Sequence, residues 1–194
     1  MLYIIGGAPR SGKTILAERM LAEHELPYFS IDTLIASLAN AQPELGLRVS
    51  DPPIKRMEVI WPTLRKLASD VSQNEAKFLL EGDVLLPMHV MEFGNGCDTG
   101  IMASFIGYAE VDPAKKLGEI RRYAAGRADW TDEVDDVHLL KLISEFRTFS
   151  EYLRSECRHY KIPYFDGSRS FSSALRDAQS YLHSGGLLDH PHAA

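Results

Sequence analysis

Residues 7–14 read GAPRSGKT, which has the spacing Gly-x-x-x-x-Gly-Lys-Thr of a phosphate-binding loop. Gly7 and Gly12 let the backbone turn so that successive N–H groups face phosphate oxygens. The ammonium of Lys13 can reach the outer phosphates, and the hydroxyl of Thr14 can coordinate Mg²⁺. We expect the whole stretch to bind a nucleoside triphosphate through Gly7, Ala8, Pro9, Arg10, Ser11, Gly12, Lys13 and Thr14.

The elements expected on either side of the loop support this interpretation. The continuous apolar run at 2–5 predicts a strand buried on both faces of a parallel sheet. Apolar residues at helical spacing then predict a helix that continues to about His24. The N-terminus of such a helix adds partial positive charge toward bound phosphates.

The rest of the chain alternates between predicted strands and helices. Further strands are expected at 27–31, 77–80, 101–108 and 162–165. Helices are expected at 33–39, at 57–71, after Pro113, at 139–153 and at 171–182, with Pro62 expected to kink or restart the second of these. Loop residues occupy 40–53, and an acidic turn occupies 130–136. This alternation predicts an α/β fold, a three-layer α/β/α sandwich with a five-stranded, mainly parallel sheet. Together with the phosphate-binding loop at 7–14, this is the arrangement of a P-loop NTPase sandwich.

We expect one domain over residues 1–182. The segments between the second and third strands, and between the fourth and fifth, are longer than a minimal crossover needs. Insertions at the carboxyl edge of such a sheet are where ligands bind. Residues 33–75 are therefore predicted to form an acceptor-binding insert and 112–136 a lid, while 183–194 are predicted to be a flexible tail.

Composition limits the classes of function. The 194 residues carry a formal net charge of −6, which argues against a general binder of nucleic acid or anionic membranes. Cys97 and Cys157 cannot make a disulfide framework and suit a reducing compartment. No run approaches the roughly 18 apolar residues of a membrane span. We expect a cytoplasmic protein with a small-molecule partner and neither nucleic acid nor membrane; the oligomeric state is not indicated.

With these elements in place, the chain to about residue 182 resembles the adenylate-kinase-like branch of P-loop kinases. It is most similar to the small-molecule type, such as 2-phosphoglycerate kinase, chloramphenicol phosphotransferase and zeta-toxin kinases. The resemblance is carried by GAPRSGKT at 7–14, SID at 30–32, LLEGD at 79–83 and IRRYAAGR at 120–127. It implies the sheet order 2-3-1-4-5 and transfer of the γ-phosphate of ATP, with Mg²⁺, to a hydroxyl or phosphate group of a small acceptor. The stretch EGDVLLP is also similar to the 2-phosphoglycerate kinase pattern but lacks a His after Val84.

The resemblance gives roles to three carboxylates at predicted strand ends. Asp32 is the candidate to orient the acceptor hydroxyl and take its proton, and the alternative is an N-cap for a helix starting at Thr33. Glu81 and Asp83 are candidates to hold Mg²⁺ together with Thr14, in a partial Walker B pattern with Glu81 at the usual Asp position. The alternative is a solvated turn at the end of the strand.

Arginines after the fourth strand are expected in the lid. A guanidinium over the γ-phosphate would neutralise the charge that develops during transfer. Arg127 is the preferred candidate because it follows Gly126, a possible hinge, whereas Arg121 and Arg122 point about 100° apart on a helix and cannot both face ATP. A solvated helix face is the alternative for each.

Two further groups complete the predicted site. Ser168 and Arg169 match the loop that contacts adenine in these kinases, although a strand-to-helix turn would use similar residues. Four insert cations could bind an anionic acceptor or serve only solubility: Arg48, Lys55, Arg56 and Arg65.

Two other functions stay open. A nucleoside or nucleotide kinase would use Asp32 and insert arginines on the sugar or phosphate. A regulatory ATP-binding protein is the non-enzyme alternative. A GTPase switch is disfavoured because no Asn-Lys-x-Asp occurs.

Overall fold

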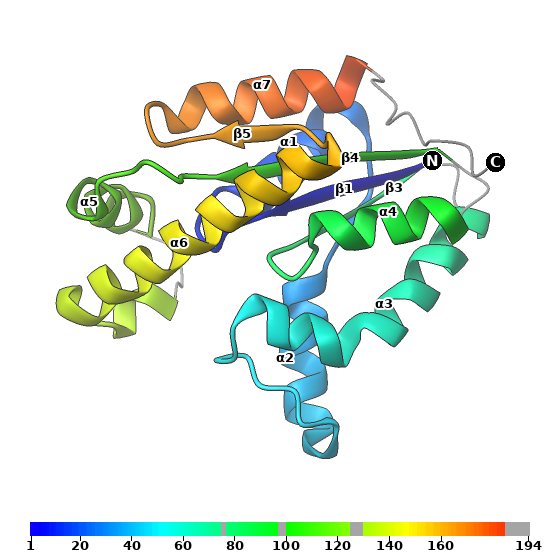
Figure 1. Ribbon diagram of the computed structural model, residues 1–194, viewed down its shortest axis with the longest axis horizontal. Coiled ribbons are helices and arrows are strands. Elements are labelled where there is room, and N and C mark those ends of the chain that lie inside the picture. The colour runs from blue at the N-terminus through cyan, green and yellow to red at the C-terminus, as the bar shows by residue number, and fades with distance from the viewer. Residues whose placement is uncertain (75–76, 97–99, 125–129, 185–194) are drawn as a thin grey trace.

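A five-stranded parallel sheet forms the centre of the computed structural model, which describes residues 1–74, 77–96, 100–124 and 130–184 (Figure 1). The strands are β1 (Leu2–Gly7), β2 (Tyr28–Ser30), β3 (Phe78–Gly82), β4 (Ile101–Gly107) and β5 (Tyr164–Asp166). Their order is β2-β3-β1-β4-β5, and every neighbouring pair is parallel. The predicted sheet order is confirmed. All carboxyl ends therefore lie at one edge, where the phosphate loop leaves β1.

Helices cover both faces of the sheet. They are α1 (Lys13–His24), α2 (Ile31–Ala41), α3 (Pro53–Asn74), α4 (Pro87–Gly96), α5 (Pro113–Ala124), α6 (Asp136–Tyr160) and α7 (Phe171–Ser184), with 3-10 turns at Pro43–Leu45 and Trp130–Glu133. Leu2 and Ile4 of β1 pack into a core with residues of α2, α3, α4 and α6. Tyr3 and Ile5 point to the opposite face and pack with α1 and α7. These three layers confirm the predicted architecture (Figure 1).

Several element boundaries differ from the prediction. Helix α4 was not predicted, and it forms because Val90 and Phe93 bury against the core. Helix α3 continues through Pro62 and does not restart there. Pro62 has no N–H to donate to the Glu58 carbonyl. Because both residues are exposed, that carbonyl can accept a hydrogen bond from water instead. Helix α2 starts at Ile31, two residues before the predicted start.

The ends of the predicted lid and tail fall partly outside the described residues. Within the lid range, α5 and the turn at Trp130–Glu133 are described, whereas Arg127 is not. Helix α7 continues to Ser184, beyond the predicted end at residue 182, and the remainder of the predicted tail is outside the described residues. No helix among the described residues is long and apolar enough to cross a membrane.

Candidate functional site

The phosphate loop connects β1 to α1 through a backbone that requires glycine. Gly7 has φ 149°, and a Cβ there would lie 2.1 Å from the carbonyl oxygen of Ile106 on β4. Gly12 has φ 95° and is the N-cap of α1, with no side-chain capping bond. The amides of the first turn are thus left for a ligand. Arg10 has φ 63°, a conformation that non-glycine residues adopt mainly where the surrounding structure imposes it.

Lys13 and Ser11 are buried within this loop. The Lys13 Nζ donates to the Ala8 carbonyl at 3.0 Å, so the ammonium is held over the loop. The Ser11 Oγ is buried and has no hydrogen-bond partner among the described residues. A buried hydroxyl without a partner is unfavourable, and a phosphate oxygen would satisfy it. The geometry of the loop therefore fits a triphosphate.

Thr14 and Glu81 meet where α1 begins and β3 ends. The Thr14 hydroxyl donates to Glu81 Oε1 at 3.5 Å, and Thr14 is exposed to solvent. Glu81 is fully buried, and its Oε2 has no hydrogen-bond partner in the described part of the chain. A hydroxyl and a carboxylate with an unsatisfied oxygen are the hard donors that suit Mg²⁺. No group of three or more His, Cys, Asp or Glu gathers among the described residues, but Mg²⁺ commonly uses one or two carboxylates plus phosphates.

Asp83 has a different partner from Glu81. Its Oδ2 accepts from Arg56 Nη2 at 2.8 Å, and both side chains are 8% exposed. Arg56 also donates through Nε to the Asp51 carbonyl at 2.9 Å. The Asp83 Oδ1 has no hydrogen-bond partner among the described residues. This buried ion pair fastens the insert helix α3 to the end of β3.

Asp32 lies in the first turn of α2, beside Asp83. Its Oδ1 accepts from the backbone N–H of Asp83 at 3.3 Å. Burial, together with the negative charge of Asp83, raises the pKa of Asp32 to about 7, although the positive charge of Lys13 opposes this rise. The N-cap of α2 is Ser30, so the interpretation of Asp32 as an N-cap is wrong. The carboxylate instead lies at the sheet edge that carries Lys13 and Glu81.

The described lid residues bind one another. Arg121 donates to the carbonyls of Thr131 at 2.5 Å and Val134 at 2.6 Å, and pairs with Asp136 at 2.8 Å. Its guanidinium thus holds the Trp130–Glu133 turn, whereas Arg122 is exposed. The preferred lid candidate, Arg127, is outside the described residues, so its role stays a prediction.

Arg10 connects the phosphate loop to the same turn. Its Nη2 lies 3.4 Å from the Thr131 hydroxyl, and its guanidinium lies 5.8 Å from the ring centroid of Trp130. The turn is therefore positioned at the mouth of the loop.

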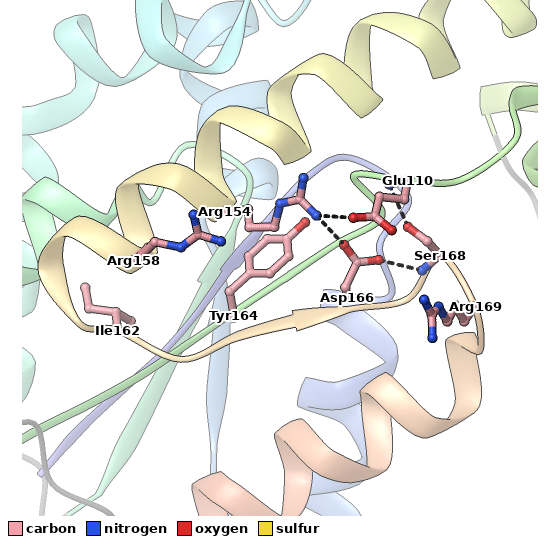
Figure 2. A pocket seen from close by; sticks show the side chains of 8 residues that line it. All are labelled: Glu110, Arg154, Arg158, Ile162, Tyr164, Asp166, Ser168 and Arg169. Atoms are coloured by element: carbon pink, nitrogen blue, oxygen red, sulfur yellow. Dashed lines mark hydrogen bonds and ion pairs between the residues drawn. The ribbon is translucent and has the colours of Figure 1, made fainter.

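The loop after β5 contacts both the β4 end and α5. The Ser168 Oγ accepts from the Glu110 N–H at 2.9 Å, and the Ser168 carbonyl accepts from Lys115 Nζ at 3.3 Å. Arg169 is exposed. Both residues line a surface pocket of about 480 Å³ between α6 and β5, where Arg154 pairs with Glu110 at 2.7 Å (Figure 2). None of the described lining residues belongs to the phosphate loop.

Sequence reasoning missed two buried residues near the phosphate loop. The hydroxyl of Tyr108 donates to the Pro9 carbonyl at 2.6 Å. Lys116 is buried with its Nζ 4.4 Å from the ring centroid of Tyr108 and 5.3 Å from that of Phe171. Burial lowers the pKa of Lys116 to about 8, with Glu119 opposing. Nothing in the pair Lys115-Lys116 indicates which one is buried.

Arg56 was named only as one of four insert cations, and the structure separates it from the others. Arg48, Lys55 and Arg65 are exposed, whereas Arg56 is buried. A signal was present in the sequence, because Arg56 continues the i, i+4 row of buried residues Ile60, Leu64 and Ala68. A charged residue in such a row indicates a buried partner.

The sheet order and the loop define the fold of P-loop kinases, and solved structures share it. The chain is similar to shikimate kinase from Bacteroides thetaiotaomicron, with TM-score 0.57, 16% identity, and coverage of 94% of this chain and 98% of that chain. It is similar to a gluconokinase from Sinorhizobium meliloti 1021, with TM-score 0.57, 15% identity, and coverage of 94% and 91%. A sugar kinase from Janibacter gives TM-score 0.56, 15% identity, and 94% coverage of both chains.

At these identities the likeness establishes the fold alone. No family model matches the chain, and no curated protein matches it.

Proposed function

We propose that this protein is a phosphotransferase that uses ATP and Mg²⁺ to phosphorylate a hydroxyl group of a small-molecule acceptor. One observation carries the proposal: a loop suited to a triphosphate and the half-buried carboxylate of Asp32 share one edge of the sheet. Phosphoryl transfer depends mainly on positioning the two substrates and on stabilising the charge that develops between them. The site offers residues for holding the phosphate donor and for orienting the acceptor.

The donor half consists of the loop and two side chains. The loop amides and Lys13 would hold the phosphates, and the unpartnered Ser11 Oγ would donate to one of their oxygens. Thr14 and Glu81 would hold Mg²⁺, which when bound would neutralise negative charge on the phosphates. We assign the metal to Glu81 in preference to Asp83, because Asp83 is already paired with Arg56.

The acceptor half centres on Asp32. Its Oδ1 accepts from the Asp83 N–H, and its Oδ2 would accept the acceptor's proton. The acceptor oxygen would then bond to the γ-phosphorus as the bond from that phosphorus to the bridging oxygen of ADP breaks. The pKa of about 7 suits a general base, because proton-transfer catalysis is most effective when the pKa lies near the working pH.

The test measures ATP binding and transfer separately. Calorimetry measures ATP affinity, while ADP release and phosphorus NMR of the product measure transfer across a panel of hydroxylated metabolites. We expect Asp32→Asn to lose at least 100-fold in kcat, as is typical for loss of a general base, with ATP affinity within about twofold of wild type. Lys13→Met should lower both, and Lys66→Met, on the exposed side of α3, should change neither.

Two results would count against the proposal. Equal losses of ATP binding and transfer in Asp32→Asn would remove its assigned role. ATP binding without transfer to any acceptor would favour the regulatory alternative.

A further inference from the structure

A buried ion pair lies beside Asp32, and the three side chains of Asp32, Asp83 and Arg56 are called the acceptor wall. Arg56 and Asp83 are each 8% exposed and lie 2.8 Å apart. Asp32 adjoins them through the Asp83 N–H. A hydroxyl presented to Asp32 would therefore come close to this pair.

The acceptor wall holds more carboxyl groups than cations of the insert. Asp32 and Asp83 contribute two carboxylates, and Arg56 is the single buried cation of the described insert. Its positive charge is matched by Asp83 before any ligand arrives. Lys55, beside it in sequence, is exposed and pairs with Asp51 at 3.1 Å.

An anionic acceptor would be unfavourable here. A carboxylate or phosphate would need the guanidinium of Arg56, and taking it would leave Asp83 buried and unpaired. The Asp83 Oδ1 has no hydrogen-bond partner among the described residues, and an ionised carboxylate or phosphate group brings no donor to it. A hydroxyl can donate to a carboxylate and accept from a guanidinium, so it satisfies this wall without breaking the pair.

We propose that the acceptor is an uncharged polyhydroxylated molecule, and that Asp83 is the specificity-determining residue that excludes carboxylate and phosphate acceptors by holding Arg56. This inference rests on the proposed function, because it concerns the acceptor of the same transfer. It narrows the acceptor from any small metabolite to a neutral polyol.

The experiment uses acceptor pairs in which one member has a neutral hydroxymethyl group where the other has a carboxylate. Glucitol and gluconate differ at one terminal carbon, as do glycerol and glycerate. We expect wild-type kcat/KM to be roughly tenfold or more higher for the neutral member of a pair, because an anionic group would have to compete with Asp83 for the guanidinium of Arg56. Asp83→Asn keeps the size of the side chain but releases the charge of Arg56. It should shift the neutral-to-anion ratio toward the anion by roughly tenfold.

Both acceptors of a pair are measured with the same variant, so the ratio of their kcat/KM values is not affected by a general loss of activity. Asp70→Asn removes the same charge from an exposed pair with Lys66 on α3 and should leave the ratio unchanged. A wild-type preference for gluconate or glycerate would overturn the inference while leaving the kinase proposal intact.

Binding gives a readout that does not need turnover. Calorimetry with gluconate in the presence of ADP should detect binding to Asp83→Asn and at least tenfold weaker or no binding to wild type. If Asp83→Asn gains no gluconate affinity, Asp83 does not exclude anions. If ATP binds but neither member of any pair is phosphorylated, the kinase proposal fails while this binding comparison still decides the role of Asp83.

Discussion

Replacing Arg56 by methionine tests whether the buried ion pair holds the acceptor insert against the sheet. Methionine keeps most of the length of the side chain but removes the charge and both hydrogen bonds. The bond to Asp83 Oδ2 at 2.8 Å and the bond to the Asp51 carbonyl at 2.9 Å are lost together. Asp83 then remains buried beside Asp32 with no cation to balance it.

The expected loss of stability follows from the burial of the pair. With charge centres about 4 Å apart and an effective dielectric constant of about 20, the attraction is about 4 kcal/mol. Desolvation offsets much of that in the intact protein, so the measured effect is chiefly that of leaving one buried charge unpaired. We expect Arg56→Met to lower the free energy of unfolding by about 3–5 kcal/mol. Arg56→Met combined with Asp83→Leu should recover most of this loss, because no buried charge remains.

Urea unfolding followed by circular dichroism measures these differences. Lys66→Met is the matched control, since it breaks an exposed pair on the same helix and should lower stability by about 1 kcal/mol or less. A loss in Arg56→Met no larger than in this control would refute the reasoning. Failure of the double variant to recover would show that Arg56 stabilises α3 by packing, independently of Asp83.

Three further outcomes test the remaining parts of the site. Because Asp32 has a pKa of about 7 when folded and an ordinary pKa near 3.8, the folded state holds a proton that the unfolded state releases. The free energy of unfolding should therefore fall as pH rises from about 4 to about 7, and Asp32→Asn should flatten this dependence in urea titrations. Gly82→Ala should lower transfer more than ATP binding, since its Cβ would lie 3.0 Å from Ile31 Cβ and 3.3 Å from Asp32 Oδ1; unchanged transfer kinetics would contradict this. Removal of Mg²⁺ with EDTA should abolish ADP release, and Glu81→Gln should raise the Mg²⁺ concentration needed for half-maximal rate by roughly tenfold, an effect that a metal titration detects.

The strands of the sheet could be predicted from the sequence because the pattern of apolar residues that marks a strand is local. Each strand is a short apolar run, and β1 and β4 are buried along their whole length. The alternation with helices then leaves few possible topologies, and the resemblance to P-loop kinases supplied the strand order among them. Helix α4 was missed because Gly94 and Gly96 have low intrinsic helix propensity, and its formation depends on tertiary packing of Val90 and Phe93.

The candidate site was predictable only in part. The phosphate loop has a fixed spacing, so Lys13 and Thr14 could be assigned from sequence. The partner of Asp83 could not, because Arg56 lies 27 positions earlier and meets Asp83 only through the packing of α3 on β3. The burial of Lys116 likewise depends on rings that α7 and the end of β4 supply.

Gly82 explains how one strand end can serve both halves of the site. Its neighbours have separate partners: Glu81 meets Thr14 on the nucleotide side, and Asp83 meets Arg56 on the insert side. Because Gly82 has no side chain, the first turn of α2 can approach β3 closely enough for Asp32 to reach the Asp83 N–H. A bulkier residue would separate α2 from β3 and move the proposed base away from both Lys13 and the acceptor wall. The close approach of α2 to β3 at Gly82 therefore sets the distance between the proposed nucleotide site and the proposed acceptor site. Glu81, assigned to the metal, precedes Gly82, and Asp83, assigned to specificity, follows it.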